Sequence, residues 1–422
     1  MNKKEVVVLG GGVAGLEFIY RLAKQDKNQR FNLTLIDRNA LHIWKPMLHT
    51  FAAGSQSADE QSILFLAQAK RHGFLYQPGT VENIDREARQ ITLAAHYDET
   101  NEEILPVRSV HYDYLIVAMG SQSNDFGIKG VKEYASKVDD LRSALEFRRV
   151  FTDQLMRSAL LKQKYHLIIV GAGATGVELS GELIDQLKIS SSYSNEDLMQ
   201  YMDITVIQAD DRVLPTFKPT ISESVRQSME KIGVKVLLST SVSEVFEDHV
   251  ELKDGETLPA DRVVWTAGIK APDVLKTLQD VELTRISQLV VDPYFRVLND
   301  NRIFAIGDCS YVKEAPLAPT AQSASQEALY LSKYFVQIIA GNESMIPDFK
   351  YVDRGSLVSI GQYASFGMFG RNTVFKGLEF RGLSAKVAHI TLYRRHQMRI
   401  LGIWSGLCAW CADQFRRWAK TR

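Results

Sequence analysis

The sequence predicts an α/β fold in which two similar domains are nested, the second inserted in the first, followed by a C-terminal amphipathic helical region. Three observations carry this prediction. An apolar strand near the N-terminus runs through a glycine turn into a helix. The same pattern returns in the middle of the chain. The last part of the chain is basic and aromatic, with helical spacing of its apolar residues.

The first strand–turn–helix pattern begins almost at the N-terminus. The apolar run Val6–Leu9 predicts a buried parallel strand. Gly10, Gly12 and Gly15 follow in the spacing G-x-G-x-x-G, and a helical pattern comes next. The first glycine allows a tight turn, the second lets a pyrophosphate approach the backbone, and the third lets the helix pack closely on the strand. Asp37, at the end of the next strand, is placed to bind a ribose hydroxyl. The pattern therefore predicts a dinucleotide site at the helix N-terminus.

The second copy of the pattern lies in the middle of the chain. The apolar strand Leu167–Val170 runs into Gly171, Gly173 and Gly176, again followed by a helical pattern. The next strand ends at Gln208, the position that corresponds to Asp37. Two such motifs in the same order predict two Rossmann-like domains and two bound dinucleotides.

Later strands complete the two domains. Each half has a short apolar strand that ends in a small-residue turn, Asp113–Gly120 in the first and Asp261–Gly268 in the second. A final strand from Arg302, ending in Gly-Asp308, is expected to return the chain to the first domain. We therefore expect residues 1–122 and 285–340 to form the first domain, residues 123–284 the second, and residues 341–422 the C-terminal region.

Four stretches carry local predictions. Ile63–Ala69 has a helical pattern, and residues 79–85 and 90–93 suggest small antiparallel strands. Residues 187–202, rich in Ser, Tyr and Asn, suggest a surface loop with a short helix.

Composition and charge limit the choice of partner. The 422 residues are 45% hydrophobic and 24% charged, as in ordinary globular proteins, and a net charge of zero gives no reason to expect nucleic acid binding. From Gly382 onward, however, eight Lys and Arg residues face the single acid Asp413, a balance of +7. This asymmetry predicts an anionic partner for the tail. The uncharged run Ile400–Ala412 is too short to span a bilayer. We also expect no signal peptide, because the first strand follows Met1–Lys4 directly.

With these motifs placed, the chain resembles the two-dinucleotide flavoprotein disulfide-reductase superfamily. Within it, the segments Leu35–Asn39, His42–Leu48, Gly173–Leu179 and Ala321–Gln326 are similar to those of bacterial type II NADH:quinone oxidoreductases. The resemblance covers essentially the whole chain. It implies FAD in the first site, NADH in the second, and a quinone as electron acceptor.

Cysteine chemistry is not expected. Disulfide reductases of the superfamily need a redox-active cysteine pair soon after the first G-x-G-x-x-G motif. Here no cysteine precedes Cys309. Cys408 and Cys411 form a C-x-x-C without the second pair that a metal or redox site would need. We interpret them as small apolar residues on a helix face, and we expect no metal site. So few cysteines also favour the cytosol.

The resemblance implies a role for each site residue. Glu178 would lie beside the nicotinamide and the flavin, although a carboxylate in the first helical turn also complements the helix dipole. Gln322 and Gln326, four residues apart and thus on one helical face, would lie at the quinone site. Gln208 departs from the Glu that is usual in NADH-selective members, and with Arg212 nearby it predicts relaxed discrimination against NADPH. The implied FAD ligands are Gly10, Gly12, Gly15, Asp37, Lys45, Val81, Ala118, Gly120 and Asp308, and the implied NADH ligands are Gly171, Gly173, Gly176, Gln208 and Gly268.

The tail predicts an interfacial helix. Its apolar residues follow i, i+3, i+4 spacing with basic residues on the other side, a pattern shared by core helices and by helices that lie on a membrane. The tryptophans and the balance of +7 favour an anionic lipid surface. The predicted apolar stripe is Trp404, Leu407, Cys408, Cys411, Phe415 and Trp418, and the polar side is Asp413, Arg416, Arg417 and Lys420.

The sequence thus predicts a peripheral flavoenzyme on the cytoplasmic face of a bacterial inner membrane. It would pass a hydride from NADH to FAD and two electrons to a membrane quinone without pumping protons. A homodimer is compatible with the sequence. One alternative is a soluble NAD(P)H-dependent reductase of a ferredoxin-like partner. Another is a flavin-based redox sensor or binding module.

Overall fold

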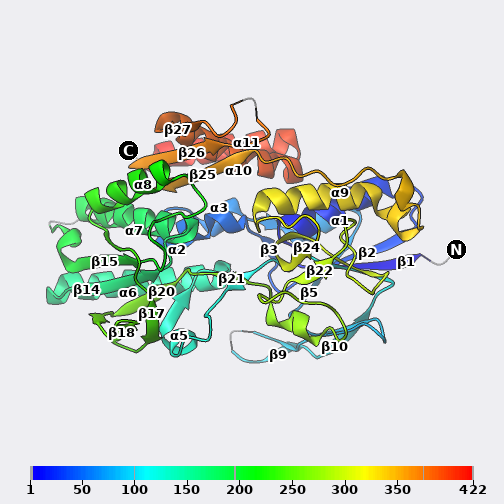
Figure 1. The fold of residues 1–422 in the computed structure, drawn as a ribbon, viewed down its shortest axis with the longest axis horizontal. Helices are drawn as coiled ribbons and strands as arrows, with labels where there is room; N and C mark the ends of the chain where they lie inside the picture. Colours follow the sequence, from blue (N-terminus) through cyan, green and yellow to red (C-terminus); the bar gives the residue numbers. More distant parts are fainter. Residues whose placement is uncertain (1–2, 99, 194–195, 374, 421–422) are drawn as a thin grey trace. The chain divides into compact units, whose positions relative to one another are not determined.

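A computed structural model describes residues 3–98, 100–193, 196–373 and 375–420, and this part of the chain forms two compact units (Figure 1). The first unit comprises Met1–Trp44, Ser62–Gln122 and Ile269–Tyr351. The second comprises Lys45–Gln61, Ser123–Gly268 and Val352–Arg422. The domain limits expected from the sequence stay a prediction.

A five-stranded parallel sheet forms the centre of the first unit, in the order β23-β11-β1-β2-β5. The strand before the first glycine turn, β1, lies in the middle of the sheet. Its Val8 is in register with Leu35 on one side and with Ile116 on the other. The strand from Ile303 pairs with β11, which is the return expected from the sequence. The strands are β1 (Lys4–Leu9), β2 (Phe31–Asp37), β5 (Leu75–Pro78), β11 (Tyr114–Val117) and β23 (Ile303–Ala305).

Two helices pack together over this sheet. They are α1 (Val13–Gln25) and α9 (Ala321–Ile339), which lie side by side in Figure 1. Phe335 of α9 is fully buried and its ring contacts Phe18, Phe31, Tyr114 and Phe304. Aromatic burial of this size is a large share of a core's stability. The late helix α9 is therefore part of the core that begins with β1.

Smaller elements complete the first unit. The predicted strands β6 (Val81–Asp85) and β7 (Gln90–Leu93) are confirmed as an antiparallel pair, joined by β10 (Arg108–His111). The expected helix from Ile63 begins only at Phe65, because Ile63 and Leu64 pair with β3. The other elements are β3 (Leu41–His42), β4 (Ile63–Leu64), α4 (Phe65–His72), β8 (His96–Tyr97), β9 (Glu103–Leu105), β21 (Ile269–Lys270), η3 (Asp273–Thr277), β22 (Leu289–Val291), η4 (Gly307–Cys309), β24 (Ser310–Val312) and η5 (Glu343–Met345). The strand β12 (Gln122–Ser123) lies where the chain passes from one unit to the other.

The sheet of the second unit repeats four strands of the first and differs at one edge, where β13 precedes the other strands in the chain and β23 follows them. Its order is β13-β20-β14-β15-β16, all parallel. The strand before the second glycine turn, β14, lies between β15 and β20, and β20 belongs to the predicted segment Asp261–Gly268. The predicted α/β class with parallel sheets is confirmed. The strands are β13 (Ala135–Lys137), β14 (Tyr165–Val170), β15 (Met202–Ile207), β16 (Lys235–Leu237) and β20 (Arg262–Trp265).

The helices of this unit correct one prediction. The loop expected over residues 187–202 is wrong for its first part, because α7 (Ala174–Tyr193) continues to Tyr193. Leu183, Ile184 and Leu187 are fully buried, so packing overrides the polar composition that follows. The remaining elements are η1 (Lys45–Met47), α2 (Leu48–Ala53), α3 (Ala58–Gln61), α5 (Val131–Tyr134), α6 (Leu141–Leu161), η2 (Leu198–Tyr201), α8 (Pro219–Lys231) and the antiparallel strands β17 (Val242–Val245), β18 (His249–Leu252) and β19 (Thr257–Pro259).

The end of the chain adds a small sheet and two helices to the second unit. Strands β25 (Gly355–Ile360), β26 (Ala364–Phe369) and β27 (Glu379–Arg381) are antiparallel and pack against α7 and α10. Helix α10 (Leu383–Leu401) ends at Gly402, whose φ of 82° breaks the helix before α11 (Ile403–Lys420). Within the described residues, no helix has both the length and the apolar content to cross a membrane.

Candidate functional site

In the first glycine turn, two of the three glycines are packed against backbone atoms and the middle one is open. Gly10 has φ +95°, and a Cβ there would lie 2.4 Å from the carbonyl oxygen of Ala118. A Cβ on Gly15 would lie 1.9 Å from the carbonyl oxygen of Gly10. A Cβ on Gly12, in contrast, would meet nothing within 4 Å. The open face of Gly12 directly precedes the N-terminus of α1, where a phosphate is favoured by backbone N–H groups and the helix dipole.

Asp37 is held at this turn by backbone groups. Its Oδ2 accepts a hydrogen bond from the N–H of Gly11 at 2.7 Å, and its Oδ1 accepts one from the N–H of Asn39 at 2.8 Å. Burial nonetheless raises the pKa of Asp37, and these hydrogen bonds oppose the rise. His42 also contacts this turn, and its Nδ1 lies 2.8 Å from the carbonyl oxygen of Gly11. The carboxylate therefore faces the glycine turn from the end of β2.

The second glycine turn has the same geometry. Gly171 has φ +106°, and a Cβ on Gly176 would lie 2.0 Å from the carbonyl oxygen of Gly171. A Cβ on Gly173 would again meet nothing within 4 Å. Gln208 takes the place of Asp37, since its Oε1 accepts a hydrogen bond from the N–H of Ala172 at 2.7 Å. Each turn therefore fits a pyrophosphate at its middle glycine.

A carboxylate stands beside Gln208. The Nε2 of Gln208 donates to Oδ2 of Asp210 at 2.6 Å. Arg212, which we expected to approach a 2′-phosphate, donates from Nη2 to the carbonyl of Pro215 at 3.3 Å. Asp210 thus brings a negative charge to the end of β15, where the sequence has an amide.

The turn around Asp308 is tied to two other segments of the first unit. Oδ2 of Asp308 accepts a hydrogen bond from Ser121 at 2.7 Å, next to Ala118 and Gly120. The N–H of Gly307 donates to Oε2 of Glu327 at 2.6 Å. Burial raises the pKa of Glu327 to about 7, and the neighbouring charge of Asp308 adds to the rise. The turn after β23 is thereby fixed from β11 and from α9.

The two glutamines lie on the first turns of α9, as predicted. Thr320 and Ser323 form a capping box at the start of the helix. The Nε2 of Gln322 donates to the hydroxyl of Tyr351 at 2.8 Å, and the Nε2 of Gln326 donates to the carbonyl of Gln322 at 3.4 Å. Both side chains are half-buried.

Glu178 is buried in the second unit beside a histidine. Its side chain is 7% exposed, and its Oε2 lies 3.5 Å from Nδ1 of His49. Its Oε1 accepts a hydrogen bond from the N–H of Ser359 at 3.2 Å. Burial raises the pKa of Glu178 to about 8 and lowers the pKa of His49 to about 3, with a further lowering from His389. Both shifts favour the uncharged forms, a protonated carboxyl beside a neutral imidazole.

The other predicted residues have varied surroundings. Val81 and Ala118 are buried, and Gly120 has φ +69° with open space around a Cβ. Gly268 has φ +64°, and its Cβ would meet the ring of Phe126 at 2.2 Å. Lys45 is exposed on η1 of the second unit.

The structure thus gathers the predicted residues in two groups. The residues predicted to bind FAD, other than Lys45, belong to the first unit together with Gln322 and Gln326. Glu178, the second glycine turn, Gln208 and Gly268 belong to the second. Sequence reasoning missed four residues, His42, His49, Asp210 and Glu327. His42, His49 and Glu327 contact residues that are distant in the sequence. Asp210 contacts the nearby Gln208, but no sequence motif marks this pair.

The described cysteines offer no accessible thiolate near either turn. Cys309 is fully buried, and burial raises the pKa of its thiol to about 12. Cys408 and Cys411 are exposed on α11 and are free thiols. A buried thiol of such high pKa is unreactive at neutral pH.

Comparison with known proteins assigns the chain to a family. A model of the pyridine nucleotide-disulphide oxidoreductase family matches residues 4–328. The type II NADH:quinone oxidoreductase of Haemophilus influenzae is 32% identical, over 99% of both chains. The chain belongs to this family. The Staphylococcus aureus (strain NCTC 8325 / PS 47) protein of the same name is 30% identical, over 90% of this chain and 93% of that one. The resemblance inferred from the sequence, and the enzyme class that it implies, are confirmed.

Solved structures share the fold of the type II oxidoreductases. The structure of NDH2 from Plasmodium falciparum in complex with NADH has a TM-score of 0.80 at 23% identity and covers 93% of this chain and 94% of that one. The sulfide:quinone oxidoreductase of Aquifex aeolicus has a TM-score of 0.73 at 18% identity, covering 94% and 91%. At these identities the likeness concerns the fold.

Proposed function

We propose that this protein is a peripheral membrane flavoenzyme that transfers a hydride from NADH to FAD and two electrons to a membrane quinone, without pumping protons. FAD would bind at the first glycine turn and NADH at the second. Bound FAD would supply the two-electron redox chemistry, as flavins do in such enzymes. The protein's own residues would bind and orient the two nucleotides and hold a proton.

The observation that carries the proposal is the pair of matching glycine turns. Each has a positive-φ glycine, an open middle glycine, and a strand-end side chain that accepts from the backbone of the turn. One turn without a partner would fit a single nucleotide. Two turns on two parallel sheets that share the order of four strands fit a donor and a resident carrier.

The two open glycines allow a direct test. A Cβ at Gly12 or at Gly173 meets no protein atom within 4 Å, and Val there would fill the space expected for a pyrophosphate. We expect Gly12→Val to be purified without FAD. We expect Gly173→Val to retain FAD that dithionite reduces but NADH does not, in a rapid-mixing experiment under anaerobic conditions. The opposite pattern, with flavin lost in Gly173→Val and kept in Gly12→Val, would reverse the assignment of the two sites.

Glu178 would take part in proton handling. A carboxyl with its pKa raised to about 8 is protonated at neutral pH and can give up a proton when the reaction demands one. The acceptor would be a quinone near Gln322 and Gln326, whose neighbours in the sequence are small Ala and Ser residues. Turnover of NADH with a short-chain quinone separates this function from a ferredoxin-linked reductase or a sensor, which would turn over quinone poorly.

Exposed apolar residues in the tail support membrane association. On α11, Trp404 is 81% exposed and Phe415 is 72% exposed, while Cys408 and Cys411 of the same predicted stripe are also exposed. Gly406, on another side of the helix, packs against Met398 of α10. A core helix would bury that stripe, whereas an interfacial helix presents it to lipid. The side chains of Asp413, Arg416, Arg417, Trp418 and Lys420 lie outside the described residues. A bilayer surface would also be the place where a quinone is met.

A further inference from the structure

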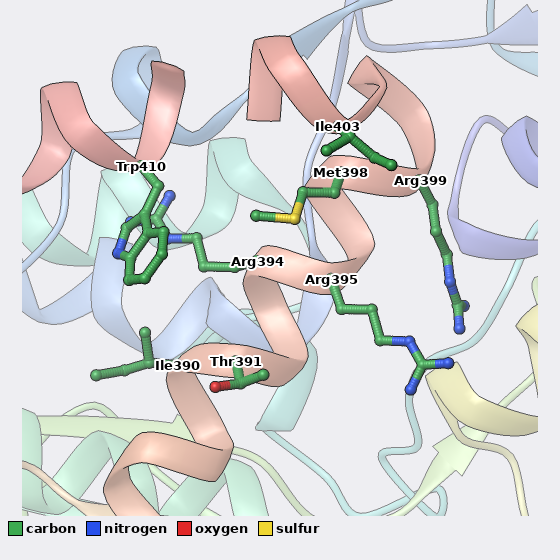
Figure 2. A pocket seen from close by; sticks show the side chains of 8 residues that line it. All are labelled: Ile390, Thr391, Arg394, Arg395, Met398, Arg399, Ile403 and Trp410. Atoms are coloured by element: carbon green, nitrogen blue, oxygen red, sulfur yellow. The ribbon is translucent and has the colours of Figure 1, made fainter. Parts of the chain in front are cut away.

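A pocket between the two tail helices combines positive charge with apolar walls. It has a volume of about 450 Å³ and is formed by both α10 and α11 (Figure 2). Four apolar side chains and three arginines line it, and none of its described lining residues is acidic. The lining residues are Ile390, Thr391, Arg394, Arg395, Met398, Arg399, Ile403 and Trp410.

The arginines have different positions in the pocket. Arg395 and Arg399 are one helical turn apart and reach to the same side of α10 in Figure 2. Arg394 is only 5% exposed, and its Nη1 donates to Oε1 of Gln397 at 2.7 Å. Gln397 in turn donates to the hydroxyl of Tyr393 at 2.6 Å. Arg394 is thus part of a fixed wall, whereas Arg395 is exposed to an incoming ligand.

The positive charges repel one another. Partial desolvation lowers the pKa of Arg395, and the charges of Arg399 and Arg354 lower it further. A bound phosphate would offset the repulsion between these like charges. The apolar side chains of Met398, Ile403 and Trp410 add a surface that suits hydrocarbon more than water.

We propose that this pocket binds the phosphate of one anionic glycerophospholipid, with Arg395 and Arg399 on the phosphate and the start of an acyl chain on the apolar wall. Exposed apolar residues also occur on the same two helices, Val387 on α10 and Trp404 on α11. This site rests on the membrane association proposed above and goes beyond it, because a discrete site binds one lipid with saturation, whereas a basic surface attracts any anionic bilayer.

The probe is dihexanoyl phosphatidylglycerol, a soluble lipid, titrated into the full-length protein below its micelle concentration. Binding is followed by calorimetry and by tryptophan fluorescence. We expect saturable binding of one lipid per chain. The variant Arg395→Gln with Arg399→Gln should bind roughly tenfold more weakly or worse, as loss of charge-assisted hydrogen bonds implies. Trp410→Phe should remove the fluorescence change while calorimetric binding persists.

A matched variant separates the pocket from diffuse charge. Lys376→Gln with Lys386→Gln removes the same two charges from exposed positions that do not line the pocket. We expect it to bind the lipid within about twofold of the wild-type protein. Equal weakening in both double variants, or no saturable binding at all, would overturn the proposal.

Two further titrations identify the source of the phosphate. Inorganic phosphate and glycerol 3-phosphate should bind much more weakly than the lipid, because they lack the acyl chain. If either binds as tightly as the lipid, the pocket is a site for a free phosphate and the lipid proposal is wrong. NADH turnover with a water-soluble quinone, measured on the same samples, reports on the proposed function alone. If the wild-type protein does not bind the lipid but turns over NADH fully, only the pocket proposal is wrong. If it binds the lipid but does not turn over NADH, only the proposed function is wrong.

Discussion

The side-chain amide of Gln208 donates to the carboxylate of Asp210 at 2.6 Å, directly beside the second glycine turn. The charge that the sequence lacks at the end of β15 is therefore supplied two residues later. A carboxylate near the ribose repels the additional phosphate of NADPH. Asp210, which sequence reasoning did not single out, becomes the first residue to test for nucleotide choice.

We predict that Asp210→Asn narrows the preference for NADH over NADPH by roughly tenfold, about 1.4 kcal/mol of differential binding. The reason is the loss of one negative charge next to Gln208. Steady-state kcat/KM for both nucleotides measures the ratio. Asp211→Asn, an exposed neighbour, is the control and should leave the ratio unchanged. Equal ratios in the wild-type protein and Asp210→Asn would show that Asp210 has no part in the discrimination.

Glu178→Gln should lower quinone-dependent turnover by roughly 10²-fold, as loss of a general acid or base does. It should also remove a step near pH 8 from the pH profile of turnover, because the pKa of Glu178 is raised to about 8. In His49→Leu the carboxyl loses its polar neighbour, so the step should move to higher pH. Full turnover with an unchanged profile in Glu178→Gln would exclude any role in proton handling.

The same carboxyl should make stability depend on pH. Its folded pKa is raised from 4.5 to about 8, so its contribution is fully present below pH 4.5 and is lost as the pH rises through 8. Glu327, with a pKa raised to about 7, acts in the same direction. The wild-type protein should therefore unfold at lower urea concentration at pH 8.5 than at pH 5, and Glu178→Gln should show a smaller difference. An equal or larger difference in the variant would contradict this origin.

Trp404→Asp with Phe415→Asp should release the protein from vesicles that contain anionic lipid, since both side chains are largely exposed and neither is needed for packing. Co-sedimentation measures the bound fraction, and reduction of the flavin by NADH checks that the site is intact. Leu64→Asp with Leu66→Asp, exposed apolar residues of the first unit, is the matched control and should remain bound. Full retention of the tail variant would contradict an interfacial α11.

Thr320→Ala should destabilise the protein by about 1 kcal/mol, the usual cost of removing a helix N-cap. Thr320 accepts from the N–H of Ser323 at the start of α9. Chemical denaturation measures the change. Thr373→Ala, a loop threonine of the second unit, gives the comparison for loss of a hydroxyl outside a helix cap. A change no larger than that of the control would show that the cap is dispensable.

The parts of the fold that could be predicted are those with a local pattern. The two glycine turns, their strands and the returning strand from Ile303 have short apolar runs beside special backbone positions, and all are found as expected. The sheet formed by β25, β26 and β27 was not predicted. Its strands are only partly buried, and its burial comes from packing against α7 and α10, which no local pattern encodes.

The candidate site shows the same limit. Gly12, Asp37 and Gln322 could be named because each occurs in a motif with a known spacing. His49 could not, because its relation to Glu178 joins residues more than a hundred positions apart and depends on burial that shifts both pKa values. Glu327 lies directly after the Ala321–Gln326 motif, yet its role appears only in its hydrogen bond to Gly307.

The place of α9 in the first unit has a consequence for synthesis on the ribosome. Phe335 completes an aromatic core with Phe18 and Tyr114, so that core stays unfinished until more than three hundred residues have been translated. The sheet of the second unit, in contrast, is contiguous from Ala135 to Trp265. Domains that are complete in the nascent chain fold first. We therefore expect the sheet of the second unit to fold before the sheet of the first unit. The N-terminal strands would then stay unfolded, and accessible to chaperones, for most of translation.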